Sequence, residues 1–160
     1  KIFTFLSPAD ITELAGAQQS QPGARLAHRR LAQEVTALVH GESAVAAVER
    51  ITAAIFSNRI DALTEQDFAQ LAQDGLPSTH FDLSEVGLLA TLFESGLATT
   101  PKGEVTLGQA KKLILGNSVA VNGVKQIDPE FKLQASAARY GRYHLIQKGK
   151  KQHHLVVLNG

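Results

Sequence analysis

The first half of the chain alternates apolar and polar positions with the spacing of helices. Ser7-Pro8 is typical of a helix start, with Ser as the cap and Pro at the first helical position. Apolar residues then recur every three to four positions over 24–41, 45–55 and 64–75. None of these helices has enough apolar surface to stand alone. We therefore expect a small helical bundle over residues 1–75.

The helical spacing stops in the middle of the chain and then resumes. Residues 76–83 contain Pro77 and fit no helix, so we predict a linker there and a domain boundary. Beyond it, residues 88–94 and 106–116 again have helical spacing, and the second run starts with a capping-box pattern.

Residues after 118 alternate with the period of strands. Asn122-Gly123 lies between alternating valines, which is the strongest short-range signal for a hairpin. Two further strands are predicted over 140–147 and 153–158, joined by a basic turn. The second domain, 84–160, is thus expected to hold two helices followed by a small antiparallel sheet. The fold class predicted for the chain is α+β.

The charge of the chain is unevenly distributed, although its formal net value is only +1. Residues 1–94 hold 6 basic and 12 acidic side chains, whereas residues 95–160 hold 10 basic and 3 acidic ones. An asymmetry of this kind suggests a polyanionic partner for the basic segment. The alternative is an ordinary surface of solvated lysines.

Composition and motifs exclude several kinds of chemistry. The absence of Cys rules out disulfides, thiolate metal sites and a Cys nucleophile. Neither a phosphate-cradling glycine loop nor an HExxH motif is present, and no run is apolar for long enough to span a membrane. His153 and His154 are neighbours on a predicted strand, so they point to opposite faces and cannot easily share a metal. We expect no catalytic residue, metal or cofactor site in this chain.

The basic segment provides the candidate binding residues. Cations on a short helix, a turn and a hairpin that fold back on one another can line one groove for phosphates. Double-stranded DNA would need a longer recognition helix, so a shallow surface of helix and sheet suits RNA better. The candidate RNA-binding residues are Lys111, Lys112, Asn117, Lys125, Arg139, Arg142, Lys148, Lys150 and Lys151.

The same residues carry a resemblance to known families. The string from Gly108 to Lys125, which ends in Val-Ala-Val-Asn-Gly-Val-Lys, resembles a small RNA-binding module first described in a small-subunit ribosomal protein. Four more segments are similar, in the same order, to the C-terminal half of the bacterial tyrosyl-tRNA synthetase family. These segments are residues 1–5, 31–42, 69–75 and 139–151. The resemblance covers nearly the whole chain.

This resemblance implies a tRNA-binding function. Residues 1–75 correspond to the helical domain that binds the anticodon arm, and residues 84–160 to the basic RNA-binding module. In the family they hold the anticodon stem and the long variable arm of tyrosine tRNA for aminoacylation by a catalytic domain. The signatures of that domain are absent, and the chain contains no Met. We therefore expect a catalytically inactive fragment of a tyrosine–tRNA ligase.

The resemblance also implies properties of the full-length enzyme. ATP with magnesium is its cofactor, its location is cytoplasmic, and its homodimer forms through the catalytic domain. Without the catalytic domain, the fragment itself can be a monomer. We expect it to have no metal and no membrane partner.

Two departures and two alternatives accompany this interpretation. Gly108 stands where relatives often have a basic side chain, and residues 99–105 form a longer connection than usual. A free-standing module that binds structured RNA, such as a stress or ribosome-associated factor, would use the same basic surface. A fragment of a pseudouridine synthase or RNA methyltransferase would carry the module ahead of a catalytic domain, whereas here the module is the last predicted domain.

Overall fold

The computed structural model describes residues 6–57 and 59–160, and its contacts divide the chain into two compact units, residues 1–53 and 54–160. Helices and a mixed sheet are both present, so the predicted α+β class is confirmed. The motif at residues 1–5 lies outside the described residues. Within the described ranges, no helix has the length and apolar character needed to cross a membrane.

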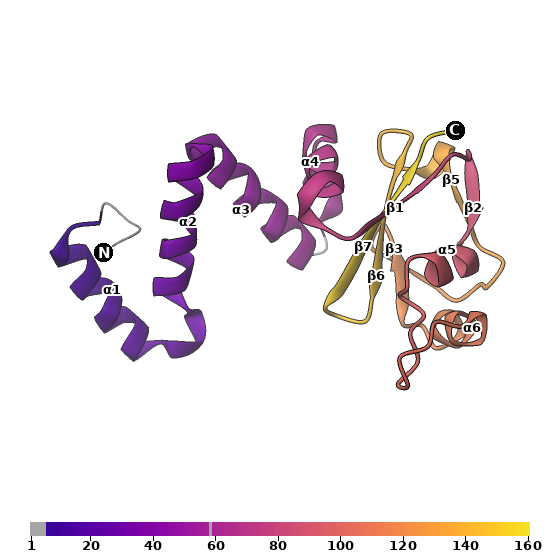
Figure 1. Cartoon of the computed structure of the whole chain (residues 1–160), viewed down its shortest axis with the longest axis horizontal. Coiled ribbons are helices and arrows are strands. Elements are labelled where there is room, and N and C mark those ends of the chain that lie inside the picture. The colour runs from indigo at the N-terminus through magenta and orange to yellow at the C-terminus, as the bar shows by residue number, and fades with distance from the viewer. Residues whose placement is uncertain (1–5, 58) are drawn as a thin grey trace. The chain divides into compact units, whose positions relative to one another are not determined.

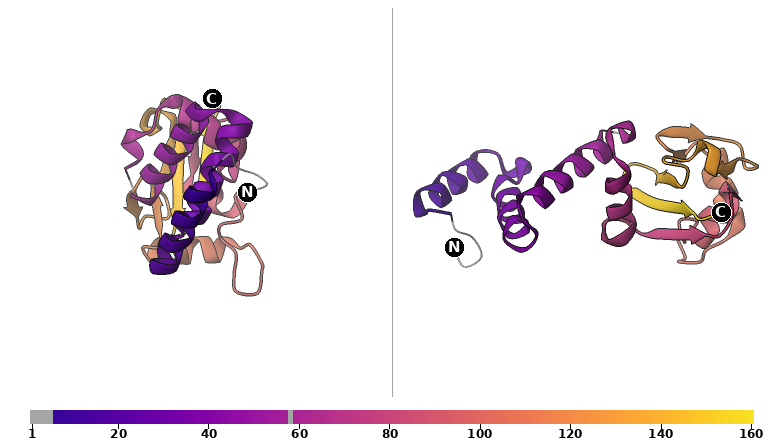
Figure 2. Two further views of the ribbon diagram at one scale, coloured as in Figure 1. Left: turned by 90° about the vertical axis from the view of Figure 1, so that its left-hand side faces the viewer. Right: turned by 90° about the horizontal axis from the view of Figure 1, so that it is seen from above.

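The first unit is built from helices in the regions where the sequence predicts them, although the first helix continues past Gly16, a plausible stop, to Ser20. Helix α1 spans Pro8–Ser20; the Ser7 side chain accepts from the Asp10 N–H, and the Asp10 carboxylate accepts from the Ser7 N–H. A short 3₁₀ turn, Pro22–Ala24, leads to α2, Leu26–His40, which contacts α1 (Figure 2). Gly41 ends α2 with a φ of 85°, and α3, Glu42–Phe56, follows.

The helices of the first unit bury few side chains. Neither α1 nor α2 contains a buried residue, and Ile51 on α3 is the buried apolar residue of the described part of this unit. The apolar stripe of α2 is at least 37% exposed at each position; it consists of Leu31, Val35, Leu38 and Val39. The sequence predicted the presence of these helices correctly. In the described part of the first unit, however, they do not form a bundle with a closed core.

The second unit contains a five-stranded sheet. Its strand order is β1 (Ser78–Phe81), β7 (Gln152–Leu158), β6 (Tyr143–Lys148), β3 (Val119–Val121) and β4 (Val124–Gln126). Strand β1 runs parallel to β7, and the other neighbours are antiparallel. A separate two-stranded sheet joins β2 (Glu85–Gly87) to β5 (Lys132–Gln134). The Asn-Gly hairpin forms as predicted, with both turn residues at positive φ.

The segment that the sequence assigns to a linker, residues 76–83, contains strand β1. Ser78 lies opposite Leu155 and Phe81 opposite Leu158, and the Leu155 N–H donates to the carbonyl of Pro77. The compact units instead divide between Ala53 and Ala54. A four-residue edge strand beside a proline has no clear local pattern, because its partner lies more than 70 positions along the chain.

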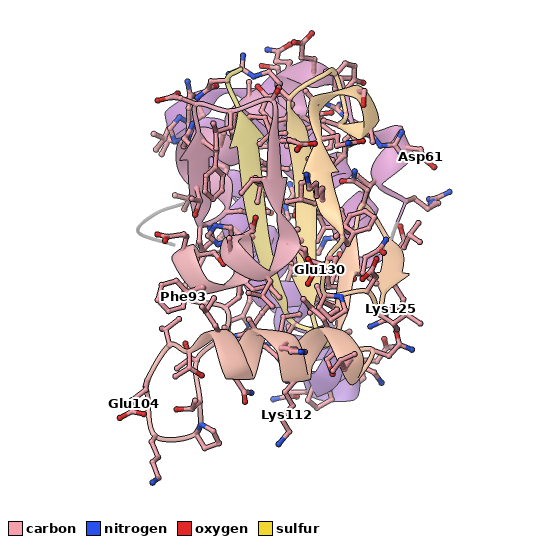
Figure 3. The ribbon with its side chains drawn as sticks, turned by 90° about the vertical axis from the view of Figure 1, so that its right-hand side faces the viewer. Asp61, Phe93, Glu104, Lys112, Lys125 and Glu130 are labelled. Atoms are coloured by element: carbon pink, nitrogen blue, oxygen red, sulfur yellow. The ribbon has the colours of Figure 1, made fainter. Side chains whose placement is uncertain are left out.

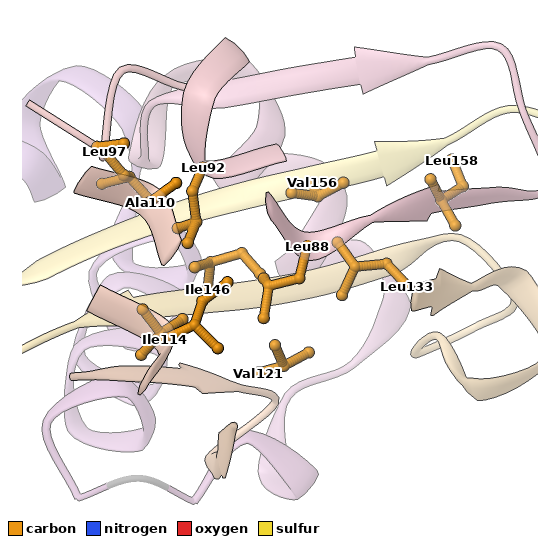
Figure 4. Packing of buried hydrophobic residues seen from close by; sticks show 12 residues of the cluster. Leu88, Leu92, Leu97, Ala110, Ile114, Val121, Leu133, Ile146, Val156 and Leu158 are labelled. Atoms are coloured by element: carbon orange, nitrogen blue, oxygen red, sulfur yellow. The ribbon is translucent and has the colours of Figure 1, made fainter. Parts of the chain in front are cut away.

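Helices cover one face of the sheet, and α5 (Leu88–Glu94) and α6 (Leu107–Leu115) provide them (Figure 1). Leu88, Leu92 and Ile114 are fully buried there against Ile146 and Val156 of the sheet (Figure 4). A core of this kind holds α6 in place with its polar side outward.

The opposite face is covered by residues that the sequence places in the first domain. A 3₁₀ turn at Ile60–Ala62, helix α4 (Glu65–Gln70) and a π-helical turn (Leu71–Gly75) lie there. Phe68 is fully buried, and its ring stacks on Tyr143 with centroids 5.3 Å apart. Residues 60–75 are therefore part of the second unit, which the sequence did not predict.

Candidate nucleic-acid interface

Helix α6 carries the first two candidate lysines on its exposed side. The Thr106 hydroxyl caps the helix by accepting from the Gln109 N–H, while Ala110 and Ile114 are fully buried. Lys111 and Lys112 lie on the remaining side and are exposed. Lys112 points away from the helix in Figure 3. Because the other side of α6 is buried, the ammonium groups of both lysines face the solvent.

The turn between β6 and β7 lies beside the end of α6. The Gly149 N–H donates to the carbonyl of Ser118 over 2.8 Å, and Gly149 has a φ of +61°, which favours glycine. Lys150 and Lys151 of this turn are exposed, as is Asn117 at the end of the helix. The sequence prediction that helix and hairpin fold back on one another holds for this part of the candidate site.

The side chains at this junction surround an open hollow of about 450 Å³. We call it the α6–turn hollow. It is lined by Leu113, Ser118, Lys148, Gly149, Lys150, Lys151 and Gln152.

Lys148 differs from its two neighbours because its ammonium group is used inside the protein. Its Nζ donates to the carbonyl of Leu97 over 2.7 Å, and Leu97 itself is buried. This bond ties the end of α5 and the connection after it to the last residue of β6. Lys148 therefore has a structural contact, and no comparable side-chain contact of Lys150 or Lys151 is found among residues 6–57 and 59–160.

Three of the nine candidates lie elsewhere in the second unit. Arg139 and Arg142 precede β6 at Tyr143, and Lys148 ends that strand about 16 Å away at roughly 3.3 Å per residue. Lys125 lies on the edge strand β4, opposite Ala120. The single groove expected from the sequence is thus not formed by all nine residues.

The two arginines contact protein groups. Arg139 forms an ion pair with Asp61, and Arg142 donates to the Asn159 side chain over 3.0 Å while lying over the Tyr143 ring. Between them Tyr140, with a φ of 54°, donates from its hydroxyl to the carbonyl of Leu63. This segment holds residues 60–68 onto the sheet.

The longer connection noted in the sequence is an ordered hairpin. Thr99 bridges Val105, the Thr100 N–H donates to the Glu104 carbonyl over 2.7 Å, and Gly103 adopts a φ of +88°. The hairpin projects from its unit (Figures 2 and 3). Lys102, between Thr100 and Gly103, is exposed.

Two buried histidines support the sheet near the site. His144 Nε2 donates to the Gln134 carbonyl, so Nδ1 accepts from the side-chain amide of Asn122 at 3.1 Å. Burial lowers the pKa of His144 and of His154, whose Nε2 lies 2.8 Å from the Thr79 hydroxyl. Among the described residues no group of three or more His, Cys, Asp or Glu could hold a metal ion.

Sequence reasoning missed several residues of the hollow. Leu113 reads as a core residue of α6, and Ser118 and Gln152 carry no charge, so a search for cations passes over them. The signal that could have found Gln152 is its place directly after the two lysines of the turn.

A module of two helices and a small sheet, with exposed lysines at one end, is typical of the class of proteins that bind polyanions. The family described as "Tyrosine--tRNA ligase SYY-like C-terminal domain" matches residues 67–156, and the chain belongs to this family. The match includes α6, the Asn-Gly hairpin and the β6–β7 turn, but begins within α4.

Individual relatives extend the similarity to nearly the whole chain. The chain is 42% identical over 157 residues to a tyrosine--tRNA ligase of Aliivibrio salmonicida, and 40% identical over 156 residues to those of Cronobacter sakazakii and Chromobacterium violaceum. In each case the alignment covers 98% of this chain and 35% of the relative. The chain thus spans about a third of the length of the curated relatives it matches.

Proposed function

We propose that this chain is the tRNA-binding C-terminal part of a tyrosine–tRNA ligase. It holds tyrosine tRNA by the anticodon stem and the long variable arm, and a catalytic part outside this chain performs the aminoacylation. The family match and the relatives named as tyrosine--tRNA ligases support this proposal. Alignment through α1–α3 as well as the module favours it over a free-standing RNA-binding module.

The observation that carries the proposal is that lysines on α6 and in the β6–β7 turn are exposed. Lys111, Lys112, Lys150 and Lys151 are all exposed, and no ion pair joins them to a carboxylate within the part of the chain that is described. Ammonium groups that are not neutralised by the protein are available to phosphates. Binding through them releases counterions, so affinity must fall with salt.

The two parts have separate roles in this proposal. Helices α1–α3 bind the anticodon arm, and the second unit, residues 54–160, holds the module that binds the variable arm. ATP and magnesium act in the catalytic part, which also forms the homodimer, and the full enzyme works in the cytoplasm. This chain alone then forms no tyrosyl-adenylate, which an ATP–pyrophosphate exchange assay checks.

The salt dependence of tRNA binding tests the proposal. Fluorescence anisotropy of labelled tyrosine tRNA with the 160-residue chain should give a log–log slope set by about −0.7 to −0.9 per phosphate contacted. The double variant Lys150→Ala/Lys151→Ala should flatten this slope by about 1–2 units. Lys125→Ala, which removes a lysine outside the hollow, is the matched control and should flatten it by less.

Selectivity supplies the second readout of this experiment. A tRNA with a short variable arm should bind more weakly than tyrosine tRNA at the same salt concentration. Equal affinity for both, together with an unchanged slope in the double variant, would contradict the proposal.

A further inference from the structure

The α6–turn hollow has fixed walls. One side is Leu113 of α6, which is half-buried and packs against the core. The opposite side is the β6–β7 turn, held by the bond from Gly149 to Ser118 and by the bond from Lys148 to Leu97. These bonds tether the two sides of the hollow, which is wide open to solvent.

The lining combines three kinds of chemistry. Leu113 and the methylene stems of the lysines are apolar, while the ammonium groups of Lys150 and Lys151 are cationic. Gln152, exposed at the start of β7, adds an amide that both donates and accepts, and no hydrogen bond of this amide is found among the described residues. A phosphate alone would use only the cations.

The size and the chemistry of the hollow match a whole nucleotide better than a bare phosphate. Its volume of about 450 Å³ lies within the roughly 300–1,000 Å³ of small-molecule sites. A base in a regular RNA duplex is stacked and paired, so it cannot enter a hollow of this kind. An unpaired base can turn outward and present its edge to a side chain, which is how sequence-specific RNA recognition commonly works.

We propose that the α6–turn hollow receives one unpaired nucleotide of the bound RNA. Its phosphate lies against Lys150 and Lys151, its base contacts Leu113, and the base edge is read by the Gln152 amide. This inference rests on the proposed function and deepens it, because it makes Gln152 a specificity-determining residue within a surface that otherwise binds phosphates.

Two labelled RNA hairpins test the proposal with the 160-residue chain. One has a single unpaired adenosine in its stem, and the other has a uridine opposite that adenosine, so its stem is fully paired. Anisotropy titrations should show the bulged RNA binding about 5- to 10-fold more tightly, as expected for one well-formed amide–base contact. The fluorescence of 2-aminopurine in place of the bulged adenosine should change on binding.

Two variants separate the base contact from the phosphate contacts. Gln152→Ala should abolish the preference for the bulged RNA and leave the affinity for the paired RNA unchanged. Lys150→Ala/Lys151→Ala should weaken both RNAs. Gln70→Ala, an exposed glutamine on α4 across the sheet, is the matched control and should change neither.

The outcomes distinguish this inference from the proposed function. Equal affinity for the two RNAs, with both weakened by the lysine variant, would overturn the nucleotide site and leave RNA binding standing. A preference that survives Gln152→Ala would also overturn it. Failure of both hairpins and of tyrosine tRNA to bind would instead overturn the proposed function.

Discussion

Lys148 offers the sharpest test of how the structure divides the basic residues. The substitution Lys148→Met keeps most of the apolar stem but removes the ammonium group that donates to the Leu97 carbonyl over 2.7 Å. A hydrogen bond to a charged group typically contributes about 1.5–3 kcal/mol. We therefore expect the variant to lose about that amount of unfolding free energy.

The comparison with an exposed neighbour makes this prediction specific. Lys150→Met removes the same group two residues along, where no protein partner is found among the described residues, so its stability should change by no more than about 0.5 kcal/mol. In RNA binding the order should reverse. Lys150→Met should flatten the salt slope by about 0.7–0.9, whereas Lys148→Met should leave it nearly unchanged.

Urea denaturation followed by circular dichroism measures the first quantity, and anisotropy titrations between low and moderate salt measure the second. Both are done on the same purified chains at one pH. If Lys148→Met were as stable as the parent chain and flattened the salt slope like Lys150→Met, the ammonium group of Lys148 would face the RNA. The structural role inferred from its bond to Leu97 would then be wrong.

Three further predictions follow from the contacts of the second unit. Tyr140→Phe loses the hydroxyl bond to Leu63 and should lower the unfolding free energy by about 0.5–1.5 kcal/mol in urea denaturation. Burial lowers the pKa of His144 and His154 in the folded chain, so the unfolded chain binds more protons below about pH 6.5. The urea midpoint should therefore be constant above that pH and fall toward pH 5. In the variant His144→Asn this fall of the midpoint should be smaller. Limited digestion with chymotrypsin, which can cut after Phe81 and Leu83, should release a resistant piece that retains residues 60–160, because Phe68 is buried on the sheet. A resistant piece that begins at residue 82 or 84 in mass spectrometry would contradict that packing.

Local signals in the sequence determined most of the elements. Ser7 caps its helix as predicted, Pro8 is the first helical residue, and Asn122-Gly123 forms the hairpin turn. These signals work because a capping hydroxyl, a proline ring or a positive φ acts over a few residues. The apolar spacing of α6 likewise indicated which of its sides would face the core and which would carry Lys111 and Lys112.

Only the tertiary structure decided how these elements are used. From the sequence alone, Arg139, Arg142 and Lys148 are candidates for RNA binding in the same way as Lys150 and Lys151, since all are cations in one basic segment. The fold pairs Arg139 with Asp61, 78 positions away, and bonds Lys148 to Leu97, 51 positions away. No local pattern encodes such partners.

The same reason explains the boundary between the two units. Strand β1 and the buried Phe68 are stabilised by β7 and Tyr143, which lie about half the chain away, so residues 60–83 look like a helix and a linker when considered alone. Spacing and caps set the helices and strands because they act locally. The pairing of distant strands and the burial of side chains between them set which lysines remain free for a ligand.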